Sequence, residues 1–282
     1  MNKQLLTEIE KLIESLIHKY LSGWEPSTMQ PLEQIFPKER RIQSIMHGLF
    51  TSFGTTLWEE LAKKLARDNG FIVLNEKEFM KQEKYPKKLE TILSRWVKKR
   101  EDSKKEIPLS GYISELKKKV STLPYQTYST ISLTSGEGID VWLKKDNIEY
   151  AFDIKTVQIN KGSGLKFNKT LMNWYAYRTL SDPNLEFKAY IAFPYNPYTP
   201  LSWWSKNGGR AKPLIENEDV LIENYFWDFL SGEKNTWALI NQAFKNVGKK
   251  NLAKKYKKTF SPKKKSKKPL QRDFLKIKRL SS

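Results

Sequence analysis

The chain has 282 residues and carries 51 Lys and Arg against 31 Asp and Glu, so its formal net charge is +20; it has two histidines and no cysteine. The absence of cysteine excludes disulfides, cysteine-based zinc sites, iron–sulfur clusters and a thiol nucleophile, so any metal site must be built from oxygen ligands. Hydrophobic residues make up 39% of the chain, which is enough for a folded core, and the excess of positive charge favours nucleic acid as a partner.

Residues 1–37 are predicted to form an amphipathic helix followed by a loop. The apolar residues between Leu5 and Ile17 fall at helical spacing, and the pattern ends at Gly23. No continuous apolar run resembles a signal peptide or a membrane span, so we expect a cytoplasmic protein without a membrane partner. His18 and His47 have no accompanying catalytic residues, so we expect them at the surface or in helix packing.

The next segment is predicted to be mainly helical. Residues 38–69 have a helical pattern with an interruption near 48–54, Gly70 is a helix stop, and residues 71–74 suit a short strand. Residues 85–120 are dense in Lys, Arg and Glu, which predicts exposed helices separated by a loop at Pro108.

The middle of the chain is predicted to form strands. Residues 128–134, 139–145 and 148–156 are rich in β-branched and aromatic residues, and the two residues Asp146-Asn147 suit a tight turn between antiparallel neighbours. A loop at 161–166, a helix at 168–180 and a strand at 187–195 follow. This order predicts an α/β fold in which helices flank a mixed β-sheet.

The last part of the chain is predicted to add helices and a basic tail. Residues 220–230 and 236–247 have helical spacing, and these helices would cover the sheet or form a dimer contact. Residues 249–282 hold 13 Lys and two Arg against Asp273 alone. We therefore divide the chain into an N-terminal helix and loop (1–37), a core domain with helical elaborations (38–248) and a basic C-terminal tail (249–282), which we expect to attract phosphates.

Three charged residues stand within the predicted hairpin. Side chains alternate along a strand, so Asp153 and Lys155 share one face while their apolar neighbours pack on the other. The turn brings Asp140, at the start of the first strand, opposite Asp153 near the end of the second. Crowded carboxylates repel each other unless a cation neutralises them, and Mg²⁺ suits such oxygen ligands. With Lys155 beside the pair, the pattern favours phosphodiester hydrolysis.

This pattern resembles the PD-(D/E)xK nuclease superfamily, in which an Asp precedes an acidic-x-Lys triplet, here Asp153-Ile154-Lys155. The Asp of the family often follows Pro, whereas Asp140 follows Ile139. Many members add a Glu from an upstream helix. Residues 53–66 resemble that helix, with Glu59 as the expected additional catalytic and metal-binding residue and Glu60 as the alternative.

The segments around Asp140 and Asp153, together with residues 226–232, further resemble a group of bacterial type II restriction endonucleases over residues 40–250. This resemblance implies Mg²⁺-dependent cleavage of double-stranded DNA, and GGNCC-like sites are one option for the sequence that is cut. It also implies a companion DNA methyltransferase. A homodimer is expected because a two-fold protein matches a two-fold site.

Five further residues are predicted to contact DNA. Gln158, three residues after Lys155, would reach a phosphate or the attacking water, and the loop containing Lys161 and Lys166 would touch the DNA backbone. Lys206 and Arg210 would read guanines from an exposed loop at 195–210, although the aromatic residues there could equally pack beneath it.

Other functions also fit the sequence. A repair nuclease or junction resolvase of the same superfamily would keep the same site residues. A non-catalytic, basic nucleic-acid-binding protein needs only the tail and the aromatic residues, and charge alone does not separate DNA from RNA processing. An Asp-x-Lys on a strand is also a common surface ion pair, and Glu59 would pair with Lys63 on a plain helix surface.

Overall fold

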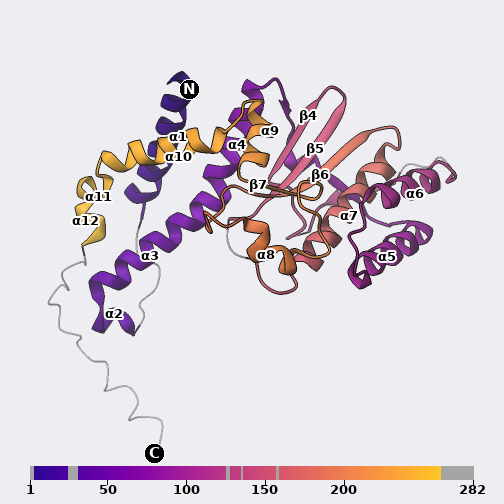
Figure 1. Cartoon of the computed structure of the whole chain (residues 1–282), viewed down its shortest axis with the longest axis horizontal. Coiled ribbons are helices and arrows are strands. Elements are labelled where there is room, and N and C mark those ends of the chain that lie inside the picture. Colours follow the sequence, from indigo (N-terminus) through magenta and orange to yellow (C-terminus); the bar gives the residue numbers. More distant parts are fainter. Residues whose placement is uncertain (1–2, 25–30, 125–127, 135, 157–158, 262–282) are drawn as a thin grey trace, which may run out of the picture.

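The core of the fold is a mixed five-stranded sheet in the order β1-β4-β5-β6-β7 (Figure 1). The computed structural model describes residues 3–24, 31–124, 128–134, 136–156 and 159–261. β1 pairs with β4 and β4 with β5 in antiparallel fashion, whereas β5–β6 and β6–β7 are parallel pairs. The predicted α/β class with a mixed sheet is confirmed. The strands are β1 (Ile72–Val73), β4 (Val141–Lys145), β5 (Ile148–Ile154), β6 (Glu186–Phe193) and β7 (Val220–Ile222).

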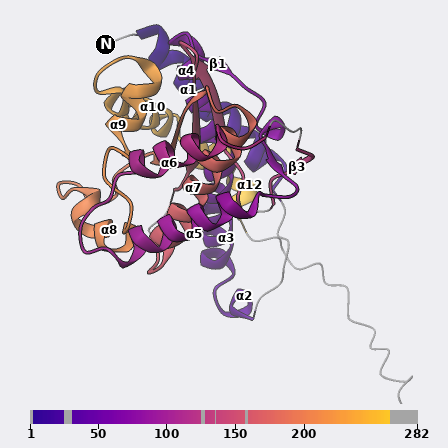
Figure 2. The ribbon, with the colours of Figure 1, turned by 90° about the vertical axis from the view of Figure 1, so that its right-hand side faces the viewer.

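Helices cover both faces of this sheet. The long helix α7 (Ser163–Ser181) packs on one face, and α5 (Lys87–Asp102) and α6 (Ser110–Val120) pack outside it (Figure 2). The other face is covered by α4 (Trp58–Asp68) and α9 (Asn224–Ser231), with α1 (Lys3–Ser22) and α10 (Thr236–Lys249) beyond them. Strand residues alternate between the two cores: Trp142 and Ala151 join the α7 side, whereas Val141 and Phe152 join the α4 side.

A helical arm extends beside the sheet (Figure 1). It contains α2 (Leu32–Ile35) and α3 (Pro37–Ser52), and a π-helical turn (Phe53–Leu57) joins α3 to α4. The predicted helix over 38–69 is therefore present, but α3 continues through Gly48 as far as Ser52, so the irregular turn begins only at the end of the expected interruption at 48–54. Gly70 follows with φ +79°. Two short helices, α11 (Leu252–Lys255) and α12 (Lys257–Phe260), complete the arm, where Arg41 Nε donates to the Thr259 carbonyl at 2.6 Å.

A second, two-stranded sheet pairs β2 (Met80–Gln82) with β3 (Thr130–Ser132). The predicted strand over 128–134 is present, but it pairs with β2, which the sequence did not predict, and not with the neighbouring β4. The short 3₁₀ turn Glu76–Glu78 connects β1 to β2.

Three predictions about secondary structure and one about exposure were wrong. Residues 220–222 form β7, not the start of a helix, because they add a parallel strand beside β6. Helix α7 begins at Ser163, inside the predicted loop, and α8 (Trp203–Ala211) occupies the second half of the predicted 195–210 loop, with the Ser202 hydroxyl accepting from the Ser205 N–H at 3.0 Å. Helices α5 and α6 are not simply exposed: they bury apolar faces against α7.

None of the helices in the described part of the chain combines the length and the apolar character needed to cross a membrane.

Candidate active site

The β4–β5 hairpin sets the register of the candidate catalytic residues. Its turn residues Asp146 and Asn147 have φ of +50° and +63°, the left-handed values that a two-residue hairpin turn requires. Val141 lies opposite Phe152, and the Asp140 N–H donates to the Phe152 carbonyl at 2.9 Å. The hairpin thus brings Asp140 to the end of β5 where Asp153 lies, as predicted.

At this end of the sheet, Asp140, Asp153 and Lys155 form one polar cluster. The Asp153 side chain is buried and forms an ion pair with the Lys155 ammonium group. Asp140 Oδ2 accepts a hydrogen bond from the Ile154 N–H at 2.7 Å, and the Lys155 N–H donates to the Ala192 carbonyl of β6 at 2.8 Å. Backbone hydrogen bonds from two strands therefore fix the positions of these residues.

The electrostatic environment of Asp140 disfavours its ionised form. Burial and repulsion by the Asp153 carboxylate raise the pKa of Asp140 to about 6, while the Ile154 N–H and the Lys155 ammonium group act in the opposite direction. A desolvated pair of carboxylates is a set of hard oxygen ligands that a divalent cation would neutralise.

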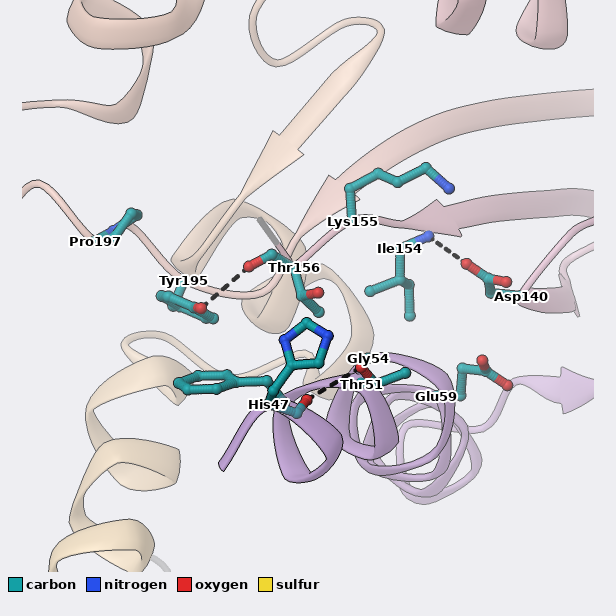
Figure 3. Close-up of a pocket in the computed structure, with 11 residues that line it drawn as sticks. His47, Thr51, Gly54, Glu59, Asp140, Ile154, Lys155, Thr156, Tyr195 and Pro197 are labelled. Atoms are coloured by element: carbon teal, nitrogen blue, oxygen red, sulfur yellow. Dashed lines mark hydrogen bonds between the residues drawn. The ribbon is translucent and has the colours of Figure 1, made fainter. Parts of the chain in front are cut away.

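Glu59, from the first turn of α4, faces the same cluster, whereas Glu60 is exposed to solvent. Burial, and next the negative charge of Asp140, raise the pKa of Glu59 to about 7. Lys63 lies 4.0 Å from Glu59 and forms a closer ion pair, at 2.8 Å, with Glu76. Of the two upstream glutamates, Glu59 is the one placed near Asp140 (Figure 3).

A cleft of about 660 Å³ opens at this cluster. Its walls come from α3, the π-helical turn, the start of α4 and the segments after β5 and β6 (Figure 3). The lining includes Glu59, Asp140 and Lys155. His47, which we expected at the surface or in helix packing, is exposed on α3 and also lines the cleft. No sequence signal marks His47, because its neighbours Thr156 and Tyr195 come from distant segments.

Those residues predicted to bind DNA that the structure describes lie outside the lining of the cleft. Lys161, just before α7, and Lys166, in its first turn, are both exposed. The next residue, Phe167, has its ring centre 5.9 Å from the Lys155 ammonium group. Lys206 and Arg210 are exposed on α8 and do not line the cleft. Gln158 lies outside the described residues.

The carboxylates of the cluster are the candidate ligands for a metal ion. Across the described ranges, no group of three or more Asp, Glu or His side chains is arranged to hold a metal ion. Asp140 and Asp153 therefore supply a two-carboxylate set with Glu59 nearby. This donor set suits Mg²⁺, which usually keeps several waters and takes one or two protein carboxylates.

Comparisons with known proteins agree with this chemistry. A sequence model of the family described as "Type II restriction endonuclease, HinfI" matches residues 1–248. The type II restriction enzyme MjaII of Methanocaldococcus jannaschii is 23% identical over 220 residues, which cover 74% of this chain and 56% of MjaII. The chain thus spans little more than half the length of this curated relative.

Proposed function

The chain belongs to the HinfI family of type II restriction endonucleases, and we propose that it hydrolyses phosphodiester bonds at a specific short site in double-stranded DNA. The observation that carries this proposal is the convergence of Asp140, Asp153 and Lys155 at the end of the β4–β5 hairpin, beside a cleft that Glu59 also lines. This arrangement supports our proposal that the site follows the PD-(D/E)xK pattern that the sequence resembles.

The residues present fit a bound Mg²⁺. Asp140 and Asp153 would hold the ion, with Glu59 as the third carboxylate, reached directly or through water. When bound, Mg²⁺ would supply Lewis-acid stabilisation of the phosphate and lower the pKa of a bound water. Ionisation of Asp140 and Glu59, whose pKa values lie near 6 and 7, would accompany binding.

Lys155 and the backbone position the reacting groups. The Lys155 ammonium group is partly exposed at the cleft and held by Asp153, so it can orient a water molecule or offset charge that builds on the phosphate. The hydrogen bond from the Ile154 N–H fixes the orientation of the Asp140 carboxylate beside Asp153, so the two carboxylates would face a cation together.

We also propose which residues contact the DNA and which other proteins take part. Lys161, Lys166, Lys206 and Arg210 would contact the DNA, the first two at phosphates and the others at guanines. We further propose a homodimer acting in the cytoplasm, with a companion methyltransferase that protects the host site. The basic residues of 249–282 would add sequence-independent attraction to phosphates.

A cleavage assay tests the proposed function. Plasmid DNA is incubated with the full chain in Mg²⁺ or in EDTA, beside Asp153→Asn and a matched control, Asp146→Asn, at the exposed turn. We expect discrete fragments with Mg²⁺ for the wild type and Asp146→Asn, and a loss of about 1,000-fold or more in rate for Asp153→Asn. A smear would indicate a non-specific nuclease. Intact DNA, or cleavage that does not need Asp153, would contradict the proposal.

A further inference from the structure

Large apolar side chains are concentrated among the exposed residues of α2, its C-terminal end and α3. Of the 11 exposed large hydrophobic residues in the part of the chain that the structure describes, six lie between positions 32 and 50. On α3, Ile42, Met46 and Phe50 follow one another at intervals of four residues, so they share one face of the helix. These six residues, here called the arm surface, are Leu32, Ile35, Phe36, Ile42, Met46 and Phe50.

The arm surface has the size of a protein interface. Ile42, Met46 and Phe50 are 36%, 42% and 59% exposed, and the three residues of α2 and its C-terminal end are each more than half exposed. Together the six side chains leave roughly 600 Å² of apolar area in contact with water, close to the ~800 Å² that each partner buries in a standard interface. An apolar surface of this size on a chain that carries a net charge of +20 is costly to leave in water.

The pattern on α3 is suited to pairing with itself. Ile42 and Phe50 lie one helical turn on either side of Met46, so two α3 helices packed antiparallel about a two-fold axis at Met46 place Ile42 against the partner's Phe50. A two-fold interface needs this kind of self-complementary patch, whereas an unrelated partner does not. Glu39, Gln43 and His47 run at the same spacing along the adjacent face, and they would form the polar rim.

The arm surface is also continuous with the cleft, because Phe50 belongs to both. We propose that the arm surface is the interface between two copies of this chain, with the α3 helices crossing at Met46. Pairing there brings the two clefts to opposite sides of one axis, which is the arrangement needed to cut both strands of a two-fold site. This last step rests on the proposed function, but the interface does not.

The first test measures the oligomeric state of the full chain by sedimentation velocity over a range of concentrations. Met46→Glu places a carboxylate at the centre of the interface, and we expect it to weaken dimerisation roughly 100-fold or more. The matched control is Ile131→Glu on β3, since Ile131 is 41% exposed, almost the same as Met46, and lies in the small second sheet. We expect this control to dimerise like the wild type.

The second test uses the absence of cysteine from the chain. Met46→Cys introduces a single thiol at the proposed axis, so mild oxidation is expected to give a disulfide-linked dimer on a non-reducing gel, whereas Ile131→Cys is expected to remain largely monomeric under the denaturing conditions of the gel. Circular dichroism spectra confirm that each variant is folded.

Three results would overturn the proposed interface. The first is a wild type that stays monomeric at all concentrations, and the second is a dimer that Met46→Glu leaves intact. The third is a chain that dimerises only after residues 262–282 are removed, because this would indicate that the tail covers the arm surface. Absence of DNA cleavage by a dimeric wild type would instead count against the proposed function alone.

Discussion

At the scale of single residues, the site is defined by carboxylates held where their charge is poorly solvated. Asp153 is buried, and Asp140 has one oxygen committed to a backbone N–H. Glu59 approaches from another element and is destabilised as an anion by burial and by Asp140. A cation binds to the ionised carboxylates, so its binding must also drive the loss of their protons. We therefore expect pH and Mg²⁺ to act on the same equilibrium, the ionisation of Asp140 and Glu59.

The pH dependence of stability tests this coupling. The pKa values of Asp140 and Glu59, about 6 and 7, lie above their ordinary values of 3.8 and 4.5, so between roughly pH 4 and 7 the folded chain binds more protons than the unfolded chain. These groups therefore make the metal-free protein less stable as pH rises through this window. Asp140→Asn removes one of them, and we expect its Tm to lie closest to that of the wild type near pH 4 and to exceed it progressively as pH rises, by about 2–4 °C at pH 8.

Thermal melts in EDTA and in Mg²⁺ make this measurement. Mg²⁺ is expected to raise the Tm of the wild type at pH 8 and to leave Asp140→Asn nearly unchanged. Asp146→Asn, at the exposed turn, provides the control for a change of Asp to Asn. Parallel pH profiles for the wild type and Asp140→Asn would rule out the proposed coupling.

Glu59 and Glu60 give a matched pair for the role of α4. Glu59 faces Asp140, and Glu60 is exposed to solvent one residue further along the same helix. We expect Glu59→Gln to reduce the Mg²⁺-dependent cleavage rate by about 10- to 100-fold, as for residues that support a metal site, and Glu60→Gln to stay near the wild-type rate. Cleavage rates at several Mg²⁺ concentrations measure this. Equal effects of the two variants would show that Glu59 has no special role.

At the scale of elements, the parts that the sequence predicted depend on local signals. The Asp146-Asn147 turn and the alternation around Asp153 lie within one hairpin, so its register and the placement of Asp140 followed from the sequence. The start of α7 did not, because Gly164 is required by a close approach to α8: a Cβ there would lie 2.2 Å from the Ala211 carbonyl oxygen. Likewise, the burial of Arg100 on the charged helix α5 depends on Asp219, 119 residues away.

The hairpin turn offers a test of how far its geometry supports the site. Asn147 has φ +63°, a conformation that a β-branched residue adopts only with strain. We expect Asn147→Val to lower the free energy of unfolding by about 1–2 kcal/mol, and Asn147→Gly, which suits this turn, to be neutral or stabilising. Urea unfolding curves measure both. A valine variant as stable as the wild type would mean that the turn does not determine the register.

At the scale of the whole molecule, the start of the basic C-terminal region is attached to α1 and to α3, and α3 borders the cleft. Lys250 pairs with Glu14 of α1 at 2.9 Å, His18 of α1 is hydrogen-bonded to the Tyr256 hydroxyl, and Arg41 of α3 donates to the Thr259 carbonyl. These contacts fix α11 and α12 beside α3, so the charge that follows Ser261 starts close to the helix that forms one wall of the cleft. The division of the chain at residues 37 and 248 stays a prediction, although Ile9 and Ile13 of α1 share a core with α4.

Salt dependence separates the contribution of this charge from that of the active site. Residues 262–282 carry seven Lys and two Arg against Asp273, so a chain ending at Ser261 keeps +12 of the net charge of +20. We expect the slope of the logarithm of the DNA-binding constant against the logarithm of the salt concentration to become shallower by about 1 for each phosphate that the shortened chain no longer neutralises. Cleavage at saturating enzyme should stay the same because the cleft residues are intact.

The matched control keeps the full length with these nine basic residues changed to Gln, and it should behave like the truncated chain. If the Gln variant instead keeps the wild-type slope while truncation lowers it, the effect of these residues is not electrostatic; if neither changes the slope, the phosphate contacts come from the folded domain, with Lys161 and Lys166 at the start of α7 as the first residues to test.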